Sequence, residues 1–232
     1  MATAKKLPFE GFPRDLPDFL WELAFHNERP WFEAHREDYE RCLNQPIRAL
    51  AREVCDKLGE KYPGKADEVH ISRIYRDARR LHGRGPYNDH LWFSLGLTGE
   101  LYDVRPKFWF GINARCCEFG MGMWGAGGAL LERWRRWIDE NPARLGGIVR
   151  RLGKLENLAL CGERYKRPKG DPGPLLYDWY NAREIAVEGT LWFSPDPPGP
   201  ELADELVDIF SRLMPLYDYM MELCLAGEET CP

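Results

Sequence analysis

Five arginines occur close together in the segment RIYRDARRLHGRGPYND, which begins at residue 73, although the chain as a whole is acidic. They are Arg73, Arg76, Arg79, Arg80 and Arg84. A guanidinium group binds carboxylate or phosphate through paired hydrogen bonds, so such a cluster requires counter-charges. Two sources of negative charge are open at this stage: a bound anionic ligand, or carboxylates of the protein itself.

Side-chain alternation divides the arginines between two faces if residues 71–80 are extended. Arg73 and Arg79 then point to the same side as Asp77. We predict that these two arginines bind a phosphate or carboxylate group, and that Asp77 orients them or acts as a catalytic base.

The remaining arginines have other predicted roles. Arg76 and Arg80 point to the opposite side from Arg73, together with the apolar Ile74. Arg76 should therefore be at least half-buried and paired with a carboxylate, because an unpaired buried charge is costly. Arg84 and the hydroxyl group of Tyr87 follow at the end of the segment, where Arg84 is expected to bind the anion and Tyr87 to donate a hydrogen bond or a proton.

The elements that must position these residues can be predicted from hydrophobic periodicity and from proline placement. Helices are expected over residues 16–27, 29–43, 46–62, 129–142, 143–152 and 175–184, and beyond Pro200. Asn44 and Pro46 are expected to end the second helix and begin the third. Strands are expected over residues 70–76, 91–95, 108–112, 116–124 and 185–193.

This grouping of helices, then strands, then helices predicts an α+β fold with a helical N-terminal segment, a central and mostly antiparallel sheet and C-terminal helices. A chain of 232 residues with 44% hydrophobic content can bury one large core, so we predict a single domain over residues 1–232. There is no signal-peptide pattern and no long apolar run, and the seven cysteines form no C-x-x-C pair. We therefore expect a soluble cytoplasmic protein with reduced thiols, without a membrane partner.

Two possible cofactor signals do not support a cofactor. Gly120, Gly122 and Gly125 spell G-x-G-x-x-G, but bulky residues keep strand alternation between them, and the acidic residues that follow end a helix rather than a second strand. The five histidines show no i, i+4 pair. We predict neither a dinucleotide nor a metal ion, and expect no other cofactor.

The arginine segment resembles the signature of the bacterial and fungal family known as domain of unknown function 2461. Members of that family have R-x-x-R-D-x-R-F, a short charged turn with a lysine, and then P-Y; here the corresponding residues run from Arg73 to Tyr87. Arg80 replaces the usual Phe, Gly83 replaces an acid or amide, and Arg84 replaces the lysine, so the resemblance implies an anion site but no carboxylate in the turn. It implies no reaction.

Three functions remain open. The first is binding of a small anionic ligand, which includes an enzyme acting on an anionic substrate. The second is binding of nucleic acid, because residues 70–170 carry 19 Arg and Lys against 10 Asp and Glu, whereas residues 196–232 carry one against nine. The third is a structural scaffold in which the arginines make internal ion pairs.

Overall fold

The computed structural model describes residues 8–77, 79, 83–97 and 104–228. Arg80 and His82 therefore lie outside the described residues. The N-terminal part is helical, as predicted, and consists of α1 (Leu16–Phe25), α2 (Arg29–Ala34), α3 (Arg36–Tyr39), the π-helical turn η1 (Glu40–Asn44) and α4 (Gln45–Lys61). The predicted apolar face of α1 is confirmed, since Leu16, Phe19, Leu20 and Leu23 are buried.

The predicted third helix over residues 46–62 agrees with α4 to within one residue at each end, whereas the predicted second helix over residues 29–43 is not one continuous α-helix. The chain breaks earlier, at His35, whose φ of −110° and ψ of 21° are not helical. It then runs without a break through Asn44, which keeps helical dihedral angles, into α4. Pro46 does not end a helix because it lies in the first turn of α4, where a backbone N–H has no intrahelical partner to lose.

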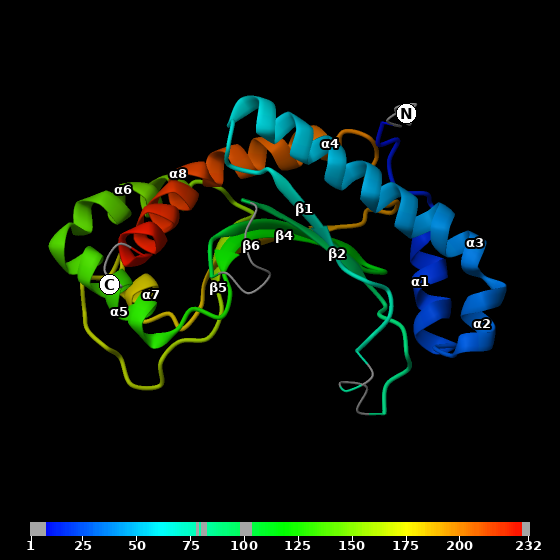
Figure 1. Ribbon diagram of the computed structural model, residues 1–232, viewed down its shortest axis with the longest axis horizontal. Helices are drawn as coiled ribbons and strands as arrows, with labels where there is room; N and C mark the ends of the chain where they lie inside the picture. Colours follow the sequence, from blue (N-terminus) through cyan, green and yellow to red (C-terminus); the bar gives the residue numbers. More distant parts are fainter. Residues whose placement is uncertain (1–7, 78, 80–82, 98–103, 229–232) are drawn as a thin grey trace. The chain divides into compact units, whose positions relative to one another are not determined.

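The strands form one six-stranded antiparallel sheet in the order β1-β2-β3-β4-β6-β5. They are β1 (Glu68–Ile71), β2 (Leu91–Gly96), β3 (Lys107–Ile112), β4 (Cys116–Met123), β5 (Ala159–Cys161) and β6 (Ile185–Trp192). β1 pairs with β2 in the register Val69–Leu95, and α4 packs on both strands (Figure 1). β1 is shorter than the predicted strand over residues 70–76, and the three-residue β5 was not predicted.

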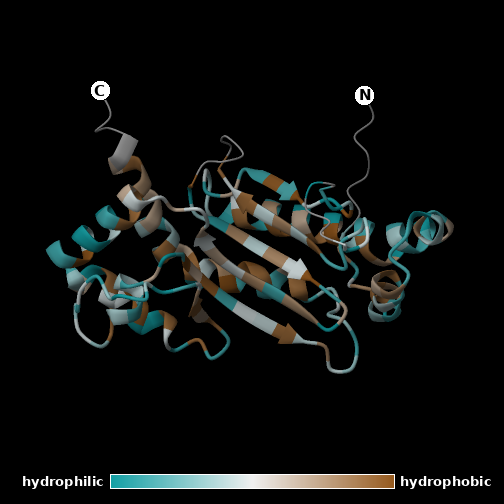
Figure 2. Cartoon of the chain, turned by 90° about the horizontal axis from the view of Figure 1, so that it is seen from below, coloured by the Kyte–Doolittle hydropathy of each residue, from teal (hydrophilic) through white to brown (hydrophobic). Residues whose placement is uncertain are grey.

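Burial alternates along β2 and β3. In β2, Leu91 and Phe93 are buried and Trp92 between them is exposed. In β3, Phe108 and Phe110 are buried, and Trp109 lies between them. Figure 2 shows the resulting hydrophobic stretches, in brown, along the strands. The buried phenylalanines form the core against the helices, and the tryptophans face the opposite side of the sheet.

The remaining helices are α5 (Gly128–Glu140), α6 (Pro142–Leu152), α7 (Tyr177–Tyr180) and α8 (Leu202–Glu228). The combination of helices and an antiparallel sheet confirms the predicted α+β class. No helix among the described residues is long and apolar enough to cross a membrane.

The chain divides into two compact units. Unit 1 comprises residues 1–97, 109–118 and 191–208, and unit 2 comprises residues 98–108, 119–190 and 209–232. The single domain over residues 1–232 stays a prediction. All of the site residues predicted from the sequence belong to unit 1.

Candidate functional site

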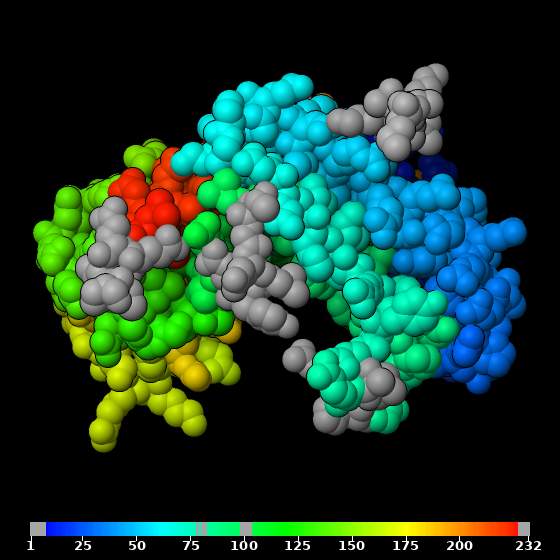
Figure 3. All heavy atoms as spheres, viewed as in Figure 1, coloured from blue at the N-terminus to red at the C-terminus, as the bar shows by residue number. Residues whose placement is uncertain are grey.

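The arginine segment leaves the sheet directly after β1 and remains extended. Ser72 donates a backbone hydrogen bond to Trp92, and Arg76 donates one to Pro86. A bridge between Tyr75 and Tyr87 closes this narrow ribbon. The predicted alternation is confirmed for residues 73–77, where only the even-numbered positions are protected from solvent. In Figure 3 the segment after β1, in turquoise, lies at the surface.

Arg76 is an internal ion-pair residue, as predicted. Its side chain is only 14% exposed, and Nη2 lies 3.5 Å from Oδ1 of Asp89. Its Nε also donates a hydrogen bond to the side-chain oxygen of Asn88 at 3.1 Å. Because its charge is already balanced inside the protein, its predicted part in binding an external anion has no support from this arrangement.

Asp77 holds Arg79 in a bidentate pair. Nε and Nη2 of Arg79 donate to the two carboxylate oxygens of Asp77 at 3.1 and 2.9 Å, and the backbone N–H of Arg79 donates to the same group at 3.0 Å. This geometry fits the predicted orienting role of Asp77. A carboxylate engaged in three such hydrogen bonds is a weak base. The predicted role of Asp77 as a catalytic base is therefore less favoured than its orienting role.

Tyr87 lies in a different environment from the exposed arginines. Its side chain is 2% exposed, and its ring stacks on Phe32 with a centroid distance of 4.1 Å. Burial raises the pKa of Tyr87. Arg73 and Arg84 are exposed and make no ion pair with any other described residue. That Arg73, Arg84 and Tyr87 form one anion-binding site together with Arg79 stays a prediction.

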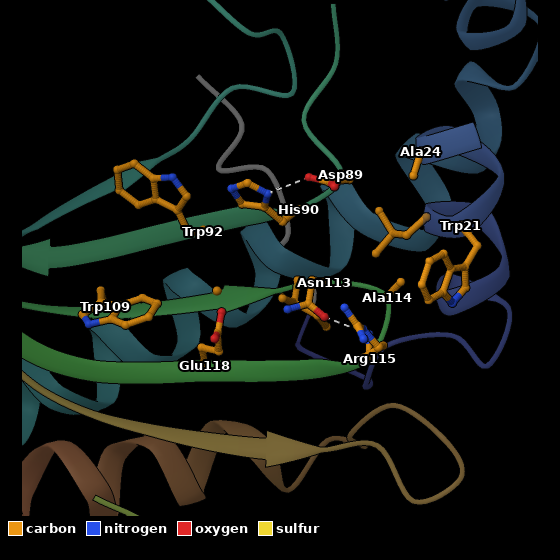
Figure 4. Close-up of a pocket in the computed structure, with 13 residues that line it drawn as sticks. Trp21, Ala24, Asp89, His90, Trp92, Trp109, Asn113, Ala114, Arg115 and Glu118 are labelled. Carbon is orange, nitrogen blue, oxygen red and sulfur yellow. Dashed lines mark hydrogen bonds and ion pairs between the residues drawn. The ribbon is translucent and has the colours of Figure 1, made fainter. Parts of the chain in front are cut away.

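A pocket of about 410 Å³ lies beside this segment, within unit 1. Its walls come from α1, β2, β3, the turn between β3 and β4, and β4 (Figure 4). Trp21, Trp92 and Trp109 supply indole surfaces, and Gly111 lies two residues after Trp109 in β3. A Cβ atom at Gly111 would touch the Trp109 ring at 3.4 Å and the Cβ atom of Trp92 at 3.5 Å, so the absence of a side chain here leaves space beside the Trp109 indole.

Asp89 links the pocket to the arginine segment. It lines the pocket, pairs with Arg76, and accepts a hydrogen bond from Nδ1 of the neighbouring His90 at 3.0 Å. Burial alone would raise the pKa of Asp89, but the hydrogen bond and the charges of His90 and Arg76 outweigh burial and lower it. A carboxylate that accepts from Nδ1 leaves Nε2 of His90 available for proton transfer or for a hydrogen bond to a ligand.

The turn between β3 and β4 presents a guanidinium group at the end of the pocket. The side-chain oxygen of Asn113 accepts hydrogen bonds from the backbone N–H groups of Arg115 and Cys116, at 2.8 and 3.1 Å, which fixes the turn. The guanidinium of Arg115 lies over the Trp21 ring, 5.7 Å from its centroid. Arg115 makes no ion pair within the described part of the chain, and Glu118 lines the pocket three residues further on.

The pocket residues that were not predicted from the sequence are His90, Trp92, Trp109, Arg115 and Glu118. A signal for two of them was present: the runs LWF and FWF each place a tryptophan between buried residues, which puts both indoles on the opposite face of the sheet. No group of three or more His, Cys, Asp or Glu side chains within the described ranges is arranged to hold a metal ion.

A comparison with curated proteins finds no match to this sequence. A family comparison does. The sequence model of the family described as "Conserved hypothetical protein (DUF2461)" matches residues 15–219. This match covers most of the 232 residues, and it confirms the family that the sequence was found to resemble. The chain therefore belongs to the DUF2461 family of conserved hypothetical proteins.

Proposed function

We propose that unit 1 binds a small molecule through a carboxylate or phosphate group on that molecule, and that the pocket beside α1 is the binding site. The observation that carries this proposal is the guanidinium of Arg115, which lies at a concave site without a carboxylate partner among the described residues. Planar, paired donors of this kind suit carboxylate and phosphate oxygens.

Packing against Trp21 strengthens this role for Arg115. A guanidinium that stacks on an indole is held in one orientation while the N–H donors at its edge stay available. The hydrogen bonds of Asn113 fix the backbone from which Arg115 projects. A fixed donor loses less conformational entropy on binding than a free surface arginine does.

The arginine segment contributes less than its composition suggests. Arg76 and Arg79 are paired with carboxylates, which leaves Arg73 and Arg84 as its exposed cations. They stay part of the proposal as a second contact for a larger anion. If the protein is an enzyme, we expect its acid–base groups to be Asp89 and His90 rather than Asp77 or Tyr87, because the imidazole of His90 lines the pocket and bonds to Asp89. We place the protein in the cytoplasm, a location that its free thiols support.

Anion-dependent stabilisation tests the proposal. The melting temperature should rise in phosphate, sulfate or acetate beyond its rise in chloride of equal ionic strength, and a hundredfold excess over the dissociation constant should add about 2.7 kcal/mol of stability. Arg115→Gln should remove this difference. Arg52→Gln, on an exposed arginine of α4 outside the proposed site, is the matched control and should retain it. If both variants and the wild type respond alike, Arg115 does not hold an anion.

Nucleic-acid binding is a second candidate function. It is favoured by a cationic loop in unit 2 whose backbone is held in place by hydrogen bonds. Residues 142–170 carry eight Arg and Lys against two Asp and Glu. Lys166, Arg167 and Lys169 are exposed and pair with no carboxylate among the described residues. In Figure 3 this loop, in yellow-green, projects at the lower left.

The buried Asn181 holds the loop from inside. Its side-chain oxygen accepts from the backbone N–H of Lys169 at 2.6 Å, and its amide nitrogen donates to the carbonyl of Gly170 at 3.0 Å. The ammonium of Lys169 lies 4.8 Å from the centroid of the Tyr165 ring. Exposed cations on a fixed backbone suit the regular phosphates of a nucleic acid.

Salt-dependent binding distinguishes this candidate from the first. A labelled oligonucleotide should bind with an affinity that falls steeply as salt rises, and Lys166→Ala with Arg167→Ala should reduce the slope by about one per lost phosphate contact. Arg183→Ala is the control, because Arg183 is already paired with Glu163. A slope that neither variant changes would remove the loop from consideration.

A further inference from the structure

The two charged groups of the β3–β4 region that line the pocket have opposite signs and do not pair. Within the described part of the chain, neither Arg115 nor Glu118 makes an ion pair. They are three residues apart, so their Cα atoms are separated by at most about 10 Å. In Figure 4, Glu118 lies between Trp109 and Arg115 along the floor of the pocket.

A purely anionic ligand uses only the positive end of this arrangement. Asp89 and Glu118 both line the pocket with Arg115, so carboxylates outnumber guanidinium groups there. The charge of Asp89 is balanced by Arg76 and His90, but that of Glu118 is not balanced by any described residue. Glu118 therefore repels an anion that lies on Arg115, unless the ligand brings a positive charge to Glu118.

The surroundings of Glu118 fit a positive group. A cation is attracted to the face of an indole, and it is bound most favourably where aromatic rings and a carboxylate occur together. Trp92 and Trp109 lie on adjacent strands and on the same face of the sheet, and Gly111, two residues after Trp109, leaves space beside the Trp109 ring. This part of the pocket is thus aromatic and negative, whereas the end at Arg115 is positive.

We infer that the ligand of this pocket is a small zwitterion, whose carboxylate or phosphate lies on Arg115 and whose ammonium group lies on Glu118 between Trp92 and Trp109. This rests on the proposed function, because it assigns the anionic end to the same guanidinium. It adds that the ligand also carries a positive charge, and it states which end of the ligand lies at Arg115 and which lies at Glu118.

Three probes of equal chain length test the inference: butyrate, butylammonium and 4-aminobutyrate. Calorimetric titration of the wild type should give a dissociation constant about tenfold lower for 4-aminobutyrate than for butyrate, as expected for one added charge contact. Glu118→Gln should abolish this preference. The same variant should bind butyrate more tightly, because the repulsion from Glu118 is gone. Glu68→Gln, an exposed glutamate in β1, is the matched control and should change neither constant.

Occupation of the space at Gly111 gives an independent test. Gly111→Leu should abolish binding of all probes, since its side chain fills the space beside the Trp109 ring. Gly111→Ala only makes ordinary contacts at 3.4 and 3.5 Å, so it should fold and weaken binding less.

Each outcome is decisive. Equal affinity of the wild type for butyrate and 4-aminobutyrate, or a preference that survives Glu118→Gln, overturns the zwitterion while the anion site at Arg115 stands. If butyrate and phosphate also fail to bind, the proposed function itself is wrong.

Discussion

The carboxylate of Asp89 contacts an imidazole and a guanidinium group at once. His90 donates to it from Nδ1, and the guanidinium of Arg76 lies 3.5 Å away. These partners lower the pKa of Asp89 although burial acts in the opposite direction. A carboxyl group whose pKa is lower in the folded state than in the unfolded state stabilises the fold only while it is ionised.

The contribution of Asp89 to stability should therefore depend on pH. It is fully present above the pKa of an unfolded aspartate, near 4, and is lost as the pH falls through the lower folded value. The free energy of unfolding in urea should show wild type more stable than Asp89→Asn at pH 5.5, with the difference shrinking toward pH 3. A difference that is constant over this range would show that the carboxylate charge contributes nothing.

Removal of the other partner tests the ion pair from its buried side. Arg76→Met should lower the free energy of unfolding by about 1–2 kcal/mol, less than for a fully buried pair, because the side chain of Asp89 is 51% exposed and water can replace the lost partner. Arg73→Met is the control on an exposed arginine of the same segment and should change stability by less than about 0.5 kcal/mol. Equal losses in both variants would contradict the division between structural and exposed arginines.

At the level of elements, β4 explains the glycines that imitate a dinucleotide motif. An added Cβ atom at Gly122 would lie 2.6 Å from Cβ and 2.7 Å from Cα of Ala186 in β6. Gly125 has a φ of +76°, which forms the turn after the strand. The glycine pattern thus serves close approach of β4 to β6 and a turn after β4.

Gly122→Ala should therefore destabilise the protein by about 1–3 kcal/mol, since backbone atoms of β6 must move. Gly59→Ala in α4 is the matched control: nothing lies within 4 Å of its added Cβ atom, and alanine should stabilise the helix by about 0.5–1 kcal/mol. Urea unfolding of both variants measures the contrast. A neutral Gly122→Ala would mean that β4 and β6 are not this close.

The sequence allowed prediction of those elements whose signals are local. The buried face of α1 and the strands β2 and β3 follow from periodicity within a few residues. The π-helical turn η1 does not, because its apolar spacing fits an ordinary α-helix and Pro46 is also compatible with a helix start.

The pocket was beyond prediction for a different reason. Trp92 and Trp109 become neighbours only through strand pairing, and Trp21 joins them only when α1 packs near the β3–β4 turn. Alternation gives the face of each residue but not which strands are adjacent. The arginine segment could be recognised from its composition. Its ion pair could not, because the partner of Arg76 is Asp89, which lies beyond the turn, and periodicity does not show which residues a turn brings together.

At the level of the whole molecule, three of the thiols belong to the packed interior. No disulfide joins the six cysteines in the described ranges, of which Cys42, Cys116 and Cys117 are buried. Burial raises the pKa of Cys42 to about 11, which disfavours the reactive thiolate. The seventh, Cys231, lies outside the described residues.

Thiol titration should therefore find close to seven groups in denatured protein that has not been reduced. In the folded protein the buried thiols should react much more slowly than the rest, because a protonated and inaccessible sulfur is a poor nucleophile. A count of three or fewer after denaturation would reveal disulfides and contradict a reduced protein.

Three of the nine tryptophans line the pocket, and this has a practical consequence. Trp21 is 53% exposed and Trp92 37%, so water surrounds much of both indoles. A molecule that displaces this water changes the polarity around the rings, and their fluorescence emission should shift to shorter wavelength. The pocket thus contains its own optical reporter, and candidate ligands can be screened on the unlabelled protein.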